Sequence, residues 1–85
     1  MIFPGTTNTI SSITLINLYN NATYYVAIQN NGSGNLTINT GLGSNIKTTY
    51  SSAVIVPTTG SALMTINTIT LNGVTTSIVD VKFLT

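Results

Sequence analysis

Residues 62–84 read ALMTINTITL-NG-VTTSIVDVKFL, two alternating runs rich in β-branched residues that meet at Asn72-Gly73. Asn-Gly between two such runs is the strongest short-range signal for a β-hairpin, because both residues tolerate the positive φ angles of a type I′ turn. A two-residue loop also fixes the register of the two strands. The stretch therefore predicts a hairpin whose cross-strand pairs extend from Leu71–Val74 at the turn to Ala62–Phe83 at the far end.

The apolar side chains of this hairpin change face between Ile66 and Ile69. One unbroken register with a single buried side cannot produce this change, because successive side chains on a strand point to opposite faces. We expect a β-bulge at Asn67-Thr68, which would shift the phase of the strand. The alternative is that the tip extends past its own core and buries Ile69, Leu71 and Val74 against another subunit.

The composition is that of a folded β-protein with almost no charge. Only 4% of the 85 residues are charged, against about 25% in ordinary domains. Disordered chains combine charge with low hydrophobicity, whereas 42% of these residues are hydrophobic. The polar residues are mainly Thr, Asn and Ser, which favour strands and turns. We expect one domain that is all-β.

The rest of the chain reads as short strands separated by turns. Residues 1–9 form the predicted N-terminal arm, and residues 10–85 form a single domain. Further strands are expected at 10–19, 23–29, 35–39, 46–50 and 53–56. The loop at 30–34 predicts a second hairpin between 23–29 and 35–39, and 46–56 reads either as two strands or as one strand bent at Ser51-Ser52. About seven short strands of this kind predict a small antiparallel β-sandwich or jelly roll.

The chain is small and has no disulfide or metal site to stabilise it, which favours self-association. A domain this small buries only about 60% of its extended surface. The sequence has no Cys for a disulfide and no His or Cys cluster for zinc. A net charge of +1 gives little repulsion between copies. A homo-oligomer, or binding to other assembly proteins, is therefore expected.

The residue types needed for catalysis are nearly absent. One Asp, two Lys and four Tyr are present, without His, Cys or Glu. A carboxylate pair, a Ser-His-Asp triad and a metal cluster are therefore excluded. We predict no enzyme activity, no cofactor and no metal site. The sequence has no basic stripe, so we do not expect it to bind nucleic acid. No apolar run is long enough for a membrane helix.

Two sets of residues are candidate contact surfaces. Apolar residues of the arm and of the hairpin tip are the predicted oligomer contacts, namely Ile2, Phe3, Ile69, Leu71 and Val74. Aromatic and hydroxyl side chains form the second set, a predicted glycan or partner surface made of Tyr24, Tyr25, Thr68, Thr70 and Thr75.

The richness in Thr, Asn, Ile and Tyr with almost no charge resembles small β-sandwich structural proteins of viruses that infect thermoacidophilic archaea. Residues 24–38 (YYVAIQNNGSGNLTI) also resemble the β-portion of archaeal pilin-type proteins, whose long N-terminal apolar helix is absent from this sequence. The first resemblance implies a capsid or capsid-decoration subunit. Met1 to Gly5 lack the features of a signal peptide, so a virion is the expected location. The alternative is a carbohydrate-binding or adhesive module, including a pilus or thread subunit, at the cell surface.

Overall fold

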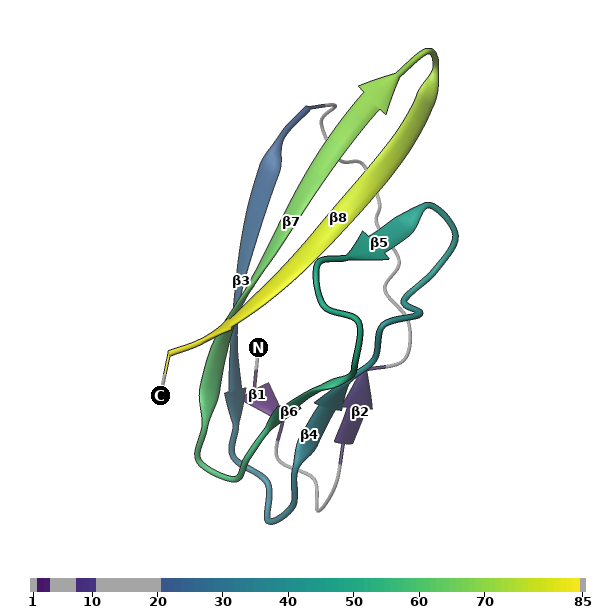
Figure 1. The fold of residues 1–85 in the computed structure, drawn as a ribbon. Helices are drawn as coiled ribbons and strands as arrows, with labels where there is room; N and C mark the ends of the chain where they lie inside the picture. The colour runs from purple at the N-terminus through teal and green to yellow at the C-terminus, as the bar shows by residue number, and fades with distance from the viewer. Residues whose placement is uncertain (1, 4–7, 11–20, 85) are drawn as a thin grey trace.

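The computed structural model describes residues 2–3, 8–10 and 21–84, and the regular elements in this part of the chain are β-strands (Figure 1). The strands are β1 (Ile2–Phe3), β2 (Asn8–Ile10), β3 (Thr23–Asn30), β4 (Leu36–Ile38), β5 (Ile46–Thr48), β6 (Val54–Val56), β7 (Ser61–Leu71) and β8 (Val74–Phe83). They form two sheets, which confirms the predicted all-β class and is consistent with a small β-sandwich.

The two sheets differ in size, and both are mixed. The larger sheet has the strand order β1-β3-β7-β8-β5, and the smaller has the order β2-β4-β6. The long pairs β3–β7 and β7–β8 are antiparallel, and so is β4–β6. The pairs β1–β3, β2–β4 and β5–β8 are parallel. The long pairs are thus antiparallel, as the sequence predicts, and the parallel pairs are made by the short strands β1, β2 and β5.

The β7–β8 hairpin has the register that the Asn-Gly turn predicts. Its pairs extend without interruption from Ala62–Phe83 to Leu71–Val74. Asn72 and Gly73 have φ angles of 53° and 78°, as a type I′ turn requires. The bulge expected at Asn67-Thr68 is wrong, since Asn67 pairs with Ile78 and Thr68 with Ser77 in the same ladder. The apolar side chains therefore change from one face to the other within a hairpin whose pairing is regular throughout.

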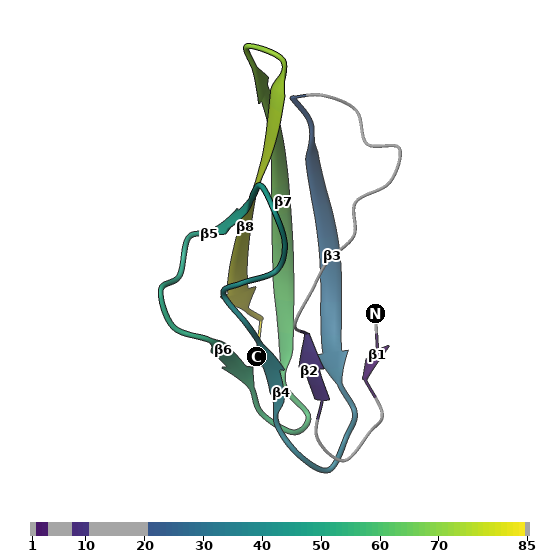
Figure 2. The same ribbon diagram turned by 90° about the vertical axis from the view of Figure 1, so that its right-hand side faces the viewer.

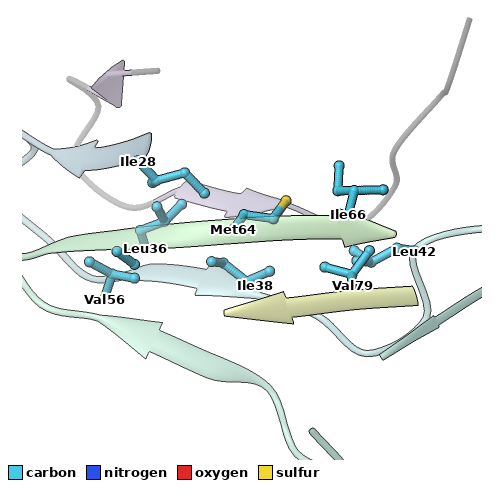
Figure 3. Close-up of a cluster of buried hydrophobic side chains, with 9 residues drawn as sticks. Ile28, Leu36, Ile38, Leu42, Val56, Met64, Ile66 and Val79 are labelled. Carbon is cyan, nitrogen blue, oxygen red and sulfur yellow. The ribbon is translucent and has the colours of Figure 1, made fainter. Parts of the chain in front are cut away.

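The hydrophobic core lies between the two sheets (Figure 3). Alternate residues of the long strands enter it, as the period of two in a strand requires. In β3 the inward residues are Tyr24, Val26 and Ile28, which alternate along the strand. The fully enclosed apolar residues are Ile28, Leu36, Ile38, Leu42, Val56, Ala62, Met64, Ile66 and Val79.

The loop after β3 leads from one sheet to the other, so the second predicted hairpin is wrong. β3 pairs with β7, whereas β4 pairs with β6. Asn30, the last residue of β3, is 0% exposed at this crossing. Its Nδ2 donates to the carbonyl oxygens of Gly34 and Val56 at 2.9 and 3.0 Å, and its Oδ1 accepts from the N–H of Gly32 at 2.9 Å. These bonds hold the loop against the smaller sheet.

Residues 46–56 are divided between the sheets as well. β5 joins the larger sheet beside β8, and β6 joins the smaller sheet beside β4. The interpretation as one bent strand is therefore wrong. Of the predicted arm, Ile2–Phe3 pair with Gln29 and Asn30, and Asn8–Ile10 pair with β4. The strand predicted at 10–19 lies outside the described residues, except for Ile10 at the end of β2.

Candidate functional site: the outer face of the larger sheet

The face of the larger sheet that points away from the core is the candidate site, and we call it the outer face. Ala62, Met64 and Ile66 of β7 point into the core, so the alternate residues of β7 and their cross-strand partners point outward. The register then assigns to this face Ile2, Thr23, Tyr25, Ala27, Gln29, Lys47, Ser61, Leu63, Thr65, Asn67, Ile69, Leu71, Val74, Thr76, Ile78, Asp80 and Lys82.

Most of the exposed large apolar residues of the described chain gather on this face. Ile69, Leu71 and Val74 are 45%, 70% and 55% exposed at the hairpin tip. Tyr25 and Ile2 are 68% and 60% exposed on the neighbouring strands β3 and β1. An exposed antiparallel sheet face normally carries polar side chains in these positions. The outer face thus exposes more large apolar side chains than a sheet face of this kind normally does.

The predicted contact residues are brought together in part. Ile2, Ile69, Leu71 and Val74 share the outer face, with Ile2 near one end and the tip residues at the other. Phe3 pairs with Asn30, so its position in the strand alternates with that of Ile2 and does not belong to the outer face. The side chain of Phe3 is outside the described part of the chain. Tyr25, predicted as a glycan contact, also lies on the outer face. Sequence reasoning missed this common face because it requires the pairing of β3 with β7.

The hydroxyl residues near the tip do not form one exposed patch. Thr68 is 2% exposed, and Ser77, its cross-strand partner, is 4% exposed. The Thr68 hydroxyl lies 3.2 Å from both the backbone nitrogen and the carbonyl oxygen of Ala22. Thr70 and Thr75 are more accessible and share a hydrogen bond of 2.9 Å between their hydroxyls. Thr68 is therefore part of the framework and does not belong to a binding surface.

The start of β3 supports the hairpin almost to its turn. The N–H of Thr68 donates to the carbonyl oxygen of Ala22 at 2.8 Å, and the N–H of Thr70 donates to Oδ1 of Asn21 at 3.1 Å. Figure 1 shows the tip of the β7–β8 hairpin extending beyond the other labelled strands, and Figure 2 shows the same from the side. The tip residues are thus held in a fixed position although they lie away from the core.

Two hollows lie along the outer face. The first, of about 260 Å³, is near the tip, and Thr23, Asn67, Ile69 and Ile78 line it from the outer face. The second, of about 180 Å³, is at the opposite end. Its lining includes Ile2, Ala27, Gln29, Ser61 and Leu84. Both hollows combine apolar walls with a few polar groups, so each can accept an apolar side chain.

All three charged side chains of the protein are on the outer face. Lys47 pairs across strands with Ile78, Asp80 with Thr65, and Lys82 with Leu63. Asp80 accepts a hydrogen bond from the hydroxyl of Thr49. They occupy the middle and the base of the face, and the tip carries no charge.

Tyr50 lies close to this charged region but serves the framework. Burial raises the pKa of the Tyr50 phenol, and the negative charge of Asp80 raises it further. The Tyr50 hydroxyl donates to the carbonyl oxygen of Asn39 at 3.1 Å. A protonated phenol that donates to a backbone oxygen is a structural contact, since both causes keep it from becoming a base.

No family model, curated protein or solved structure matches the chain. Within the described residues, His, Cys, Asp and Glu form no group of three that could hold a metal ion. The same part of the chain contains no helix long and apolar enough to cross a membrane. The case for a function therefore rests on the outer face.

Proposed function

We propose that this chain is a non-enzymatic structural protein of a virion or another extracellular assembly, most simply a capsid or capsid-decoration subunit that self-associates. The observation that carries the proposal is the outer face. Its sheet already buries one side in the core, yet the other side exposes Ile2, Tyr25, Ile69, Leu71 and Val74. Apolar patches of this kind mark contact sites with other molecules.

Burial of the outer face supplies a driving force of the size that association needs. Full burial of a Val, Leu or Ile side chain is worth about 1.5–3 kcal/mol. Several such side chains on each of two subunits together contribute on the order of 10 kcal/mol, which is comparable with the cost of about 4–15 kcal/mol for bringing two proteins together. The apolar side chains thus offset much of that cost, and the polar contacts of the face add to them.

The chemistry of the surface supports the same proposal. The side chains that could move a proton at neutral pH are few, and Asp80 is engaged by Thr49. Contacts made by apolar and hydroxyl groups depend little on salt, because screening acts on charges. A particle built from such contacts would remain intact over a wide range of ionic strength.

The proposal is tested by measuring the solution mass of the full chain by light scattering at increasing concentration and at two salt concentrations. We expect oligomers or a lattice that persist at high salt, with particles visible by electron microscopy. A variant that lacks residues 1–5, checked by circular dichroism for retained strands, tests the contribution of Ile2. A monomer under all conditions would contradict self-assembly and leave either decoration of a lattice made by another protein or carbohydrate binding.

One observation favours a second function, a carbohydrate-binding or adhesive module. Tyr25 is 68% exposed, and its neighbours on the outer face include Thr23 and Thr65. An exposed aromatic ring beside hydroxyl groups provides an apolar platform and polar contacts for a sugar. Tyr24, in contrast, packs against the core. Binding of the protein to a glycan array, with loss of the signal in Tyr25→Ala but not in Tyr24→Phe, would support this function over assembly.

A further inference from the structure

The two ends of the outer face have complementary shapes. At the tip, Leu71 and Val74 project from the last cross-strand pair of the hairpin and are 70% and 55% exposed. At the base is the hollow of about 180 Å³ whose lining includes Ile2, Ser61 and Leu84. The N–H of Leu84 donates to the carbonyl oxygen of Ser61 at 2.9 Å, which continues the ladder past β8. The face thus carries an apolar projection at one end and an apolar hollow at the other.

The two ends exchange places under a rotation about the middle of β7. Leu71 and Ser61 are the end residues of this strand, and Ile66 lies midway between them. A two-fold axis that runs parallel to the sheet and perpendicular to its strands, just above the outer face at the level of Ile66, turns a second copy end for end over the first. The tip of each copy then lies over the base of the other. Both contacts are made at once, as in any isologous interface.

The same rotation brings opposite charges together. Lys47 pairs with Ile78, which pairs with Asn67, so Lys47 lies beside position 67 of β7. Asp80 pairs with Thr65 and lies beside position 65. These two positions are one residue on either side of Ile66, so the rotation exchanges them. Asp80 of one copy then comes level with the partner's Lys47, on the neighbouring strands β8 and β5. The arrangement therefore offers two symmetric pairs of opposite charge near the axis.

The area of the face suits a stable dimer. The neighbouring strands β3, β7, β8 and β5 have 8, 11, 10 and 3 residues. At about 3.4 Å per residue and about 4.8 Å between strands, they cover on the order of 500 Å². Two copies together then bury on the order of 1,000 Å², the size that a specific interface needs. A face that contains both the projection and its hollow, and both signs of charge, is complementary to itself.

We propose that a second copy of this chain packs on the outer face, end for end about a two-fold axis near Ile66, with Leu71 and Val74 seated in the partner's base hollow. This inference rests on the proposed function and names the partner and the geometry of its contact. Because both copies use the same face, the contact closes on itself and gives a dimer as the unit from which a larger assembly is built.

The first experiment is sedimentation velocity of the full chain over a range of concentrations. We expect a species of twice the 8.9 kDa of one chain. Leu71→Lys places a charge in the apolar hollow of both copies and should weaken dimerisation by about 100-fold or more, since each lost Leu contact is counted twice. The matched control is Ile55→Lys, on the outer side of the smaller sheet, where Ile55 is 42% exposed. It should leave the dimer unchanged, and thermal unfolding should show that both variants fold.

The second experiment tests the orientation of the two copies. Lys47→Asp alone and Asp80→Lys alone should each weaken the dimer by about tenfold, because like charges then face each other across the axis. An equal mixture of the two variants should form a heterodimer with the affinity of the wild type. Repulsion that acts only within one chain would not be relieved by mixing, so failure of the mixture to associate would overturn the end-for-end geometry.

Three other outcomes separate this inference from the proposed function. A monomer at every concentration would overturn the inference and leave decoration of a different lattice as the role of the chain. Species that grow without limit and are lost in Leu71→Lys would show tip-to-base contacts in an open filament. That result would overturn the two-fold axis while supporting assembly. A dimer lost in Ile55→Lys but not in Leu71→Lys would place the contact on the smaller sheet.

Discussion

The base and the tip of the β7–β8 hairpin share two strands and one register but have opposite apolar faces. At the base, Met64 and Ile66 point into the core and are 3% and 5% exposed. At the tip the residues on that same side are hydroxylated, and Ile69 and Leu71 point outward. The comparison shows that alternating apolar residues identify the buried side of a strand only where another element of the same chain covers that side. Where it does not, the apolar side chains stay exposed, as Ile69 and Leu71 are at 45% and 70%.

The two halves are also held by different interactions. The base is fixed by burial of aliphatic side chains between the sheets. The tip is fixed by hydrogen bonds, from the backbone of Thr68 and Thr70 to Ala22 and Asn21 and between the hydroxyls of Thr70 and Thr75. Such bonds contribute about 0.5–1.5 kcal/mol each, which is enough to order a hairpin tip that has little core of its own.

The largest expected effect comes from removing an aliphatic side chain at the base. Ile66→Ala should lower the free energy of unfolding by about 2–5 kcal/mol, because it leaves a cavity among enclosed neighbours. Ile69→Ala is the matched control, with the same residue type in the same strand on the other face. Measured by denaturant unfolding at low protein concentration, it should cost less than about 1 kcal/mol, since surface substitutions usually change stability little. Equal losses in the two variants would contradict the distinction between base and tip.

An intermediate effect is expected from removing the buried hydroxyl on the inner side of the tip. Thr68→Val should cost about 1–3 kcal/mol, because the N–H of Ala22 loses its acceptor in a nearly closed site. Thr70→Val removes an accessible hydroxyl from the same face and should change stability by less than about 0.5 kcal/mol. Thermal unfolding of the two variants gives the comparison. A costly Thr70→Val with a neutral Thr68→Val would contradict this ranking and assign the support of the tip to the Thr70–Thr75 hydrogen bond.

The smallest effect on the single chain is expected from Leu71→Thr combined with Val74→Thr. Thr is a good strand residue, and both positions are exposed, so the free energy of unfolding of the monomer should change by less than about 0.5 kcal/mol. The same change should abolish concentration-dependent growth in light scattering. A marked loss of monomer stability would show that these side chains are buried within their own chain.

The local features of the fold could be predicted from the sequence, and the distant pairings could not. Asn72-Gly73 determines the turn and, with it, every pair of the hairpin, because a two-residue loop leaves no freedom of register. The strand β3 was predicted at nearly its observed bounds, since its residues favour strands and turn residues flank it. The partners of β1, β2 and β5 were not predictable, because strands of two or three residues carry no pattern that selects a neighbour or a direction.

The residues of the candidate site were predictable, but their grouping was not. Ile2, Tyr25 and the tip residues were identified as apolar or aromatic residues without an evident place in the core. Their common face depends on β3 pairing with β7 instead of β4. The loop between β3 and β4 is held by the enclosed side chain of Asn30, which in the sequence has the form of an ordinary turn residue. The bulge prediction failed because it assumed that every apolar run belongs to the core of its own chain.

The placement of residues 31–60 between β3 and β7 has a consequence for the order in which the protein folds. β7 and β8 are joined by two residues, and hairpins of this kind close in about 1–10 μs. β3 can join them only after the chain that carries β4, β5 and β6 has folded back, and pairings between distant segments are slow because loop entropy is lost first. The hairpin, with its apolar tip, thus forms before the core it belongs to. We therefore expect separation along the chain, more than the strength of the contacts, to set the order in which the parts of this sheet form.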